Sequence, residues 1–365
     1  MRMRIAWSEG MGAKPRGCRA RRWFLMAGSS QRAGLRPTYC KRRLYKRSQG
    51  KGILVPPLRC AKAGEAEVCH YLAQNGEFVL WVVEGRGLVE RARGLHSPIS
   101  PTATQALGRV LLGTLLIGES KETMETVQVT FKGNGPLGQV MAIAEKGHVK
   151  GRMNAYTVES DLVNPGGNGT VGDAVGRQGV VTVVRKNKSL QQYTGNQQMG
   201  ITELVNGEVA EDLTNYLAES EQINSALGLG LVLASDLTVS SAGGYLLQML
   251  PGATEDTVEK LEQSVSSCPP VSEMMEARMT QREVAESLCG DLGLELVFQK
   301  TLGYGPCNTT NLSERMAGAL KLMPVTEIRS ILEEQGMVEM ECEFCREKVV
   351  FTEEDLVARG VIGEL

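Results

Sequence analysis

Histidine is scarce in this 365-residue chain, which contains only three, and aromatic residues make up 5% of it. There is no serine–histidine–acid set, no paired carboxylates in a recognisable setting and no nucleotide-binding loop, so an enzyme active site has little to be built from. Long apolar runs are also lacking. The densest, Val110 to Ile117, is interrupted by Gly113 and Thr114, whereas a membrane span needs about 18 apolar residues. These absences favour a soluble protein that is not an enzyme.

Acidic residues are almost missing from the first sixty positions, which carry 16 lysines and arginines but a single acid, Glu9. Of the totals of 40 basic and 42 acidic residues, 24 and 41 remain for residues 61–365, a net charge of −17. A basic leader ahead of an acidic body is typical of an organellar transit peptide, and this leader lacks the apolar stretch of a secretory signal. The alternative is an arm that contacts nucleic-acid phosphates.

The segments 29–31 and 58–61 of this leader resemble a plastid targeting sequence and its cleavage site. We therefore expect residues 1–60 to be removed and the protein to reside in the chloroplast stroma. The alternatives are the mitochondrion and the cytoplasm. The acidic body opposes phosphate binding, so we expect no nucleic-acid partner and, from the absence of apolar runs, no membrane partner.

The nine cysteines do not form the disulfide framework of a small secreted domain. Three of them lie in or beside the leader. Three more are scattered through the body without the spacing of metal ligands: Cys69, Cys268 and Cys289. This usage favours a reducing compartment in which a few thiols can be oxidised.

The remaining thiols lie near the C-terminus. The Cys342–Cys345 pair, Cys-Glu-Phe-Cys, precedes the apolar Val349–Phe351, which predicts a small hairpin whose two sulfurs can share a metal ion or close into a disulfide. Upstream there is only Cys307, so a four-thiolate zinc site is half supplied. Thiol–disulfide exchange is an alternative, although catalytic pairs normally open a helix and glutamates flank this one. The candidate redox-active residues and zinc ligands are therefore Cys342, Cys345 and Cys307.

Alternating apolar residues between 126 and 186 predict antiparallel strands joined by glycine-rich turns. Before them, Ser100 and Pro101 predict the start of a long helix. We also expect one strand from Tyr71 to Val83, and a buried strand over Leu227–Ala234 that precedes a turn at Gly243-Gly244. The glycine-rich run 164–169 lacks the Gly-Lys-Ser/Thr ending of a phosphate loop, so we interpret it as a tight connection.

After Pro251-Gly252 the pattern becomes helical. Thr254 begins a helix that two prolines end at 269–270, and a second is expected over Ser272–Met279. A capping box at Thr280–Glu283 begins a third, which ends near residue 290. Beyond Cys307, helices are expected over 313–322 and 324–334, followed by the thiol hairpin.

Six blocks of sequence, in order and together with the thiol pair, resemble the heat shock protein 33 family of redox-regulated, ATP-independent holdase chaperones. The likeness covers about Tyr71 to Leu356. The blocks are SPTATQALGR at 100–109, KGNGPLG at 132–138, YTG at 193–195, GEVAEDL at 207–213, YLAESEQ at 216–222 and GGYLLQ at 243–248.

The resemblance implies a C-terminal switch of pattern Cys-x-Cys-Ser-x-Glu-Arg, a helix pair and then Cys-x-x-Cys. Cys342 and Cys345 match the second pair, and Glu314-Arg315 match the Glu-Arg. Thr309 and Asn311 stand where the first two cysteines would be, and Cys307 lies two residues too early. The resemblance therefore implies zinc as cofactor, with an incomplete first ligand pair.

In this family the helical linker loosens and exposes apolar surface to clients. Methionine adapts its shape on promiscuous binding surfaces, although it is also ordinary core filler. By this resemblance we assign client binding to Met274, Met275 and Met279.

The sequence as a whole predicts an α+β fold: an antiparallel-sheet body with covering helices at 61–252, a helical linker at 253–306 and a small C-terminal redox module at 307–365. By the resemblance, the expected function is that of an ATP-independent holdase chaperone that binds unfolded clients, is switched on by oxidation and, like other family members, forms a homodimer when active. The alternatives are a thiol–disulfide oxidoreductase that uses Cys342 and Cys345, and a constitutive holdase with a degenerate switch.

Overall fold

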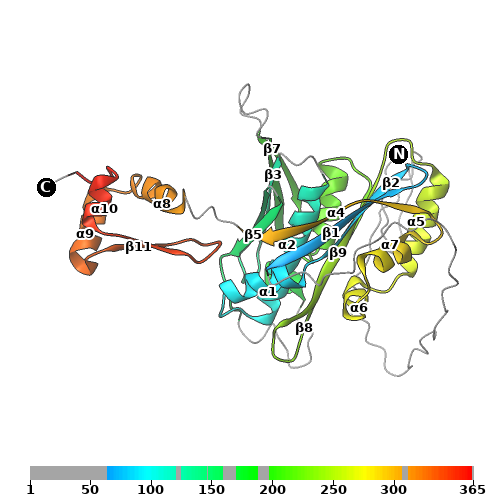
Figure 1. Cartoon of the computed structure of the whole chain (residues 1–365), viewed down its shortest axis with the longest axis horizontal. Helices are drawn as coiled ribbons and strands as arrows, with labels where there is room; N and C mark the ends of the chain where they lie inside the picture. The colour runs from blue at the N-terminus through cyan, green and yellow to red at the C-terminus, as the bar shows by residue number, and fades with distance from the viewer. Residues whose placement is uncertain are drawn as a thin grey trace. The chain divides into compact units, whose positions relative to one another are not determined.

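A computed structural model of the chain describes residues 64–120, 125–145, 147–158, 170–187, 197–305 and 311–363 (Figure 1). The basic leader, the glycine-rich run at 164–169, Cys307 and Thr309 lie outside the described residues. Among the described helices, none is both long and apolar enough to cross a membrane.

The described part of the chain contains groups of strands interspersed with helices, and it ends in a small hairpin flanked by helices. The strands are β1 Glu65–Ala73, β2 Phe78–Glu84, β3 Glu125–Gly133, β4 Gln139–Glu145, β5 His148–Met153, β6 Gly179–Asn187, β7 Gln197–Glu203, β8 Ser225–Leu233, β9 Val239–Met249, β10 Leu294–Tyr304, β11 Val338–Glu341 and β12 Lys348–Phe351. The helices are α1 Arg86–Leu95, α2 Pro101–Glu119, α3 Val171–Val175, α4 Ala210–Glu219, α5 Glu255–Ser267, α6 Val271–Glu276, α7 Gln281–Cys289, α8 Leu312–Leu320, α9 Val325–Gln335 and α10 Glu353–Ala358.

Strands β1 to β10 form one sheet in the order β7-β6-β3-β4-β5-β10-β1-β2-β9-β8. Its neighbouring strands are antiparallel, except that β10 and β5 pair in parallel through Gly303 and Tyr304. In Figure 1 the orange β10 lies beside the blue β1, although more than two hundred residues separate them in the chain. The α+β class with an antiparallel sheet and covering helices is thus confirmed.

One face of the sheet is covered by α2, the helix predicted from its start signal. The Ser100 side chain accepts a hydrogen bond from the Ala103 backbone amide, and Pro101 occupies the first helical position. Buried residues of α2 such as Leu107 and Leu111 pack on the sheet. Strands β3 to β6 supply the other side of this core through alternate residues, as a sheet with one solvated face requires.

The linker helices α5, α6 and α7 cover the opposite face at β1, β2, β8 and β9. Strand β2 is therefore buried on both faces. Val79, Trp81 and Val83 lie in the core between the sheet and α2, called the first core, and Phe78, Leu80 and Val82 lie in the second core, between the sheet and the linker helices. A continuous apolar run is the expected sequence of a strand between two covered faces.

Three local predictions were wrong. The 71–83 segment contains a turn between two antiparallel strands rather than one strand. Gly243 and Gly244 lie inside β9, and the turn comes earlier, at 234–238. A Cβ on Gly243 would lie 2.3 Å from Met275 Sδ and 2.6 Å from the Val83 carbonyl oxygen, so close packing explains this glycine. Helix α6 is also shorter than predicted and ends at Glu276.

The C-terminal elements form a core of their own around the two-stranded β11–β12 sheet. Ile328 of α9, Phe351 of β12 and Leu356 of α10 are nearly inaccessible to solvent. Helix α9 ends at Gly336, whose left-handed φ of 74° closes the helix without the strain that a side chain would cause.

Candidate functional site

The predicted thiol hairpin is present. Strands β11 and β12 pair from Val338–Phe351 to Glu341–Lys348. The turn between them is closed by two backbone hydrogen bonds, from the Cys342 amide to the Glu347 carbonyl at 2.9 Å and from the Arg346 amide to the Cys342 carbonyl at 2.8 Å. Cys342 and Cys345 are half-buried beside the module's core. The pair therefore lies in a strand-to-strand turn. It does not lie at a helix N-terminus, the position that lowers the pKa of a catalytic thiol.

The described residues supply two zinc ligands at most. Cys342 and Cys345 lie together, but among the described histidines, cysteines and acids no group of three or more could hold a metal ion. Asn311 directly precedes α8, and its amide is a poor zinc ligand beside thiolate. Two of the four ligands that a structural zinc site needs are therefore present, and the described part of the chain does not by itself fit the ion.

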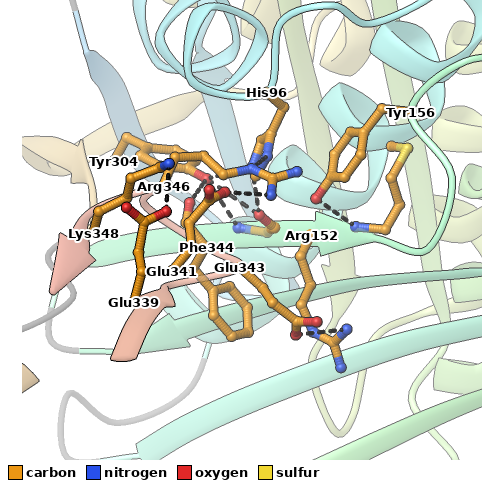
Figure 2. A network of polar contacts seen from close by, with 12 residues as sticks. His96, Arg152, Tyr156, Tyr304, Glu339, Glu341, Glu343, Phe344, Arg346 and Lys348 are labelled. Atoms are coloured by element: carbon orange, nitrogen blue, oxygen red, sulfur yellow. Dashed lines mark hydrogen bonds and ion pairs between the residues drawn. The ribbon is translucent and has the colours of Figure 1, made fainter. Parts of the chain in front are cut away.

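The hairpin turn also contacts the body, which sequence reasoning had not foreseen (Figure 2). Tyr304, the last residue of β10, donates its hydroxyl hydrogen to the Phe344 carbonyl at 2.9 Å. Arg346 donates from Nε to Nδ1 of His96 at 3.2 Å, and its guanidinium lies over the Tyr156 ring, 4.8 Å from the centroid. Arg346 also pairs with Glu341 of its own hairpin at 2.7 Å.

His96 is the buried centre of this contact and is 2% exposed. Its Nε2 lies 3.1 Å from the Gly151 carbonyl oxygen, which can only accept a hydrogen, so the proton sits on Nε2 and leaves Nδ1 to accept from Arg346. Burial, and after it the charge of Arg346, lowers the pKa of His96 to about 4. The neutral imidazole is thus the form that this contact requires.

Two of the three candidate client-binding methionines lie on the buried side of helix α6, and the third follows that helix. Met274 and Met275 are 1% and 6% exposed, and Met279 is partly buried against the same core. Their neighbours there include Leu80 and Tyr245. In this arrangement they are core residues, and a client could reach them only after α6 had separated from the sheet.

Three further thiols lie in or against this second core. Cys268 ends α5, and its Sγ donates to the Ser287 carbonyl of α7 at 3.1 Å. Burial raises the pKa of the Cys289 thiol to about 12 and that of Cys69 to about 11. Both are therefore protonated and unreactive while the linker helices stay packed.

Known proteins resemble the chain over most of its length. A sequence model described as "Hsp33 protein" matches residues 67–352. The "33 kDa chaperonin" of Listeria innocua is 34% identical over 286 residues, covering 78% of this chain and 95% of the relative. That of Bacillus subtilis is 32% identical and covers 78% and 94%.

The chain belongs to the Hsp33 family.

A solved structure agrees with this membership. The crystal structure of the 33 kDa chaperonin, or heat shock protein 33 homolog, of Thermotoga maritima superposes with a TM-score of 0.70 at 30% identity. It covers 80% of this chain and 97% of that one. Membership of the Hsp33 family confirms the prediction of a chaperone rather than an enzyme.

Proposed function

We propose that this Hsp33-family chaperone holds unfolded or partly folded proteins on apolar surface, without ATP, and that oxidation of Cys342 and Cys345 switches the activity on. The second core supports this proposal, because α5 to α7 cover apolar residues that become accessible when the helices loosen. Met274 and Met275 lie on the inner side of that cover, where an adaptable side chain suits many clients. We further propose that the active form is a homodimer.

The test is aggregation of a thermally unfolding client, followed by light scattering without nucleotide. The oxidised chain should suppress aggregation at a near-stoichiometric ratio. A different result would favour the oxidoreductase: catalytic reduction of a disulfide substrate, abolished by Cys345→Ser, with no suppression of aggregation. Light scattering of the chain alone, reduced and oxidised, tests the proposed dimer.

We propose that zinc is held weakly, so that the switch is partly open in the reduced state. A complete four-thiolate site contributes on the order of 10 kcal/mol of folding free energy in zinc-finger peptides. Thr309 and Asn311 cannot supply two of those thiolates. The second candidate function, a constitutive holdase, rests on the absence of a third ligand among the described residues.

A Thr309→Cys/Asn311→Cys variant separates these alternatives. It should bind one zinc per chain and fall silent when reduced, whereas the unmodified chain should hold less zinc and show appreciable holdase activity when reduced. One tightly held zinc in the unmodified chain, with no activity before oxidation, would mean that Cys307 or another ligand completes the site.

We also propose that the mature protein begins near Ala61 and resides in a plastid. This rests on the basic, nearly acid-free composition of residues 1–60, which precede the segment that matches the family. N-terminal sequencing of protein from its native source is the test, and retention of Met1 would contradict the proposal.

A further inference from the structure

Among the described residues, helices pack on only one face of half of the large sheet. Helices α2, α3 and α4 pack against β3 to β7 from the first-core side. On β5, Gly151 faces that core, because a Cβ there would lie 2.9 Å from Leu107 Cδ1. Its neighbours Lys150 and Arg152 must therefore project from the opposite face. On the adjacent strand β4 they pair with Ile143 and Met141, which are half-buried.

The residues of that face continue across the sheet as a mixed apolar surface. Met199 and Ile201 of the edge strand β7 are 60% and 57% exposed. Met199 and Ile201 pair with Val184 and Thr182 of β6, respectively. Continuing through β3, these two rows of paired residues reach Ile143 and Met141 of β4. We call this surface, from β7 to β5, the open face. Lys150 and Arg152 form its cationic border.

The thiol hairpin sits on that border. The Phe344 ring lies 5.3 Å from Lys150 Nζ and 5.8 Å from Arg152 Cζ, measured to the ring centroid, so both cations lie within cation–π range. Glu343 accepts from Arg152 Nη1 at 2.9 Å, and Figure 2 shows the two side chains pointing toward each other. The Tyr304 hydroxyl donates a hydrogen bond to the backbone of the same turn, at the Phe344 carbonyl.

These contacts use features that any peptide can offer. One is a backbone carbonyl, one is a carboxylate and one is the face of an aromatic ring. Glu343 remains 66% exposed, so its ion pair with Arg152 is a reversible surface contact, unlike the buried contact between Arg346 and His96. An intramolecular occupant held this loosely is displaced when its own module loosens or when a competitor is abundant.

We propose that the cationic border of the open face binds client segments in which an acidic residue precedes an aromatic one, and that Glu343-Phe344 of the hairpin is their internal competitor. The proposal deepens, and rests on, the holdase function proposed above. Residues 61–365 carry a net charge of −17, so two adjacent cations offer acidic chains an attractive site on an otherwise acidic protein. The apolar open face beside them accommodates the residues that flank the aromatic one.

The experiment measures binding of a short fluorescein-labelled Gly/Ser peptide that carries Glu-Phe, by fluorescence anisotropy with the reduced full-length chain. A Glu343→Gln/Phe344→Ala chain takes the hairpin's carboxylate and ring away from the two cations, and it should bind the peptide about tenfold more tightly than the unmodified chain, a change of about 1.4 kcal/mol. Adding Lys150→Glu/Arg152→Glu should remove that gain. Arg177→Glu, which alters an exposed cation paired with Asp173 on the body, is the matched control and should leave binding unchanged.

Lys150→Gln/Arg152→Gln repeats the test without charge reversal, and far-UV circular dichroism verifies that each variant is folded. Unchanged affinity on vacating the hairpin, or unchanged affinity on removing the two cations, overturns the proposal. Equal binding of a Lys-Ala peptide, or of a single-stranded oligonucleotide of the same charge, overturns the acidic–aromatic assignment. If the peptide results are as expected but the chain does not suppress client aggregation, the holdase function is refuted and the proposed binding site is retained.

Discussion

The two halves of the large sheet differ in what covers the face opposite α2. At β1, β2, β9 and β8 it is sealed by α5 to α7, and Phe78 and Leu80 there are fully buried. At β3 to β7 no described helix covers the corresponding face, and the described contacts of the hairpin with its border are polar and cation–π contacts. Apolar burial contributes roughly 25 cal/mol per Å², whereas an exposed ion pair contributes about 0–1 kcal/mol. Removing the linker helices from the sheet therefore costs far more than releasing the hairpin.

Truncating one apolar side chain on each half gives the largest contrast. Phe78→Ala removes a ring that is fully enclosed between β2 and the linker helices, and should lower the free energy of unfolding by about 3–5 kcal/mol. Ile143→Ala removes a half-buried side chain on the open face and should cost less than about 1.5 kcal/mol. Urea unfolding of both variants measures the difference. Equal losses would show that the open face is covered in solution.

Much of this division is visible in the sequence. The run Phe78–Val83 is apolar at every position, which indicates a strand covered on both sides, and the alternation around Val127–Phe131 indicates one covered face. Strand β10 was missed, and its residues 294–304 were placed in a helical linker. Its side chains are largely exposed, and its pairing partner β1 is more than two hundred residues away in the sequence. The local sequence therefore contains no pattern that predicts this strand.

A glycine-to-alanine change in β8 should lift the cover off the sealed half. A Cβ on Gly230 would lie 2.4 Å from the Ser272 backbone nitrogen of α6, and backbone cannot swing aside as a side chain can. Gly230→Ala should cost about 1–3 kcal/mol and make the linker core accessible in the reduced state. We expect more binding of an apolar fluorescent dye and more suppression of client aggregation.

The matched control is Gly94→Ala in α1. A Cβ at Gly94 meets no heavy atom within 4 Å, and alanine favours the helix. This variant should keep the dye binding and activity of the unmodified chain. If Gly230→Ala also behaved like the unmodified chain, α6 would not be seated on β8 in solution, and the linker cover would lose its support as the switch.

The candidate site was predictable only in part, for a similar physical reason. The Cys-x-x-Cys spacing and the apolar residues after it predict the hairpin. Its contact with the body depends on His96, Tyr156 and Tyr304, which come from three separate segments. Each of these alone looks like an ordinary core or surface residue, and only the fold brings them together. The lone arginine after the second cysteine, Arg346, was the available signal, because a charge in a tight thiol turn needs a partner.

Acid should loosen the hairpin while the apolar linker core stays packed, and this is the smallest expected effect. His96 has a pKa of about 4 when folded and about 6.5 when unfolded, because burial and then Arg346 disfavour its charged form. The unfolded state therefore binds the proton first. The contribution of neutral His96 is complete above pH 6.5 and is lost as the pH falls toward 4, by roughly 1–2 kcal/mol between pH 7 and pH 5.

Titration of the histidine ring protons by NMR tests this directly. In the unmodified chain His96 should titrate near 4, and Arg346→Gln should raise its pKa, because the nearby positive charge is removed while most of the burial remains. His70 on β1 is the internal control, since its pKa is lowered by burial and by Lys300, and Arg346→Gln should leave it unchanged. Near-normal titration of His96 in the folded chain would mean that the imidazole is solvated and that Arg346 does not dock on it.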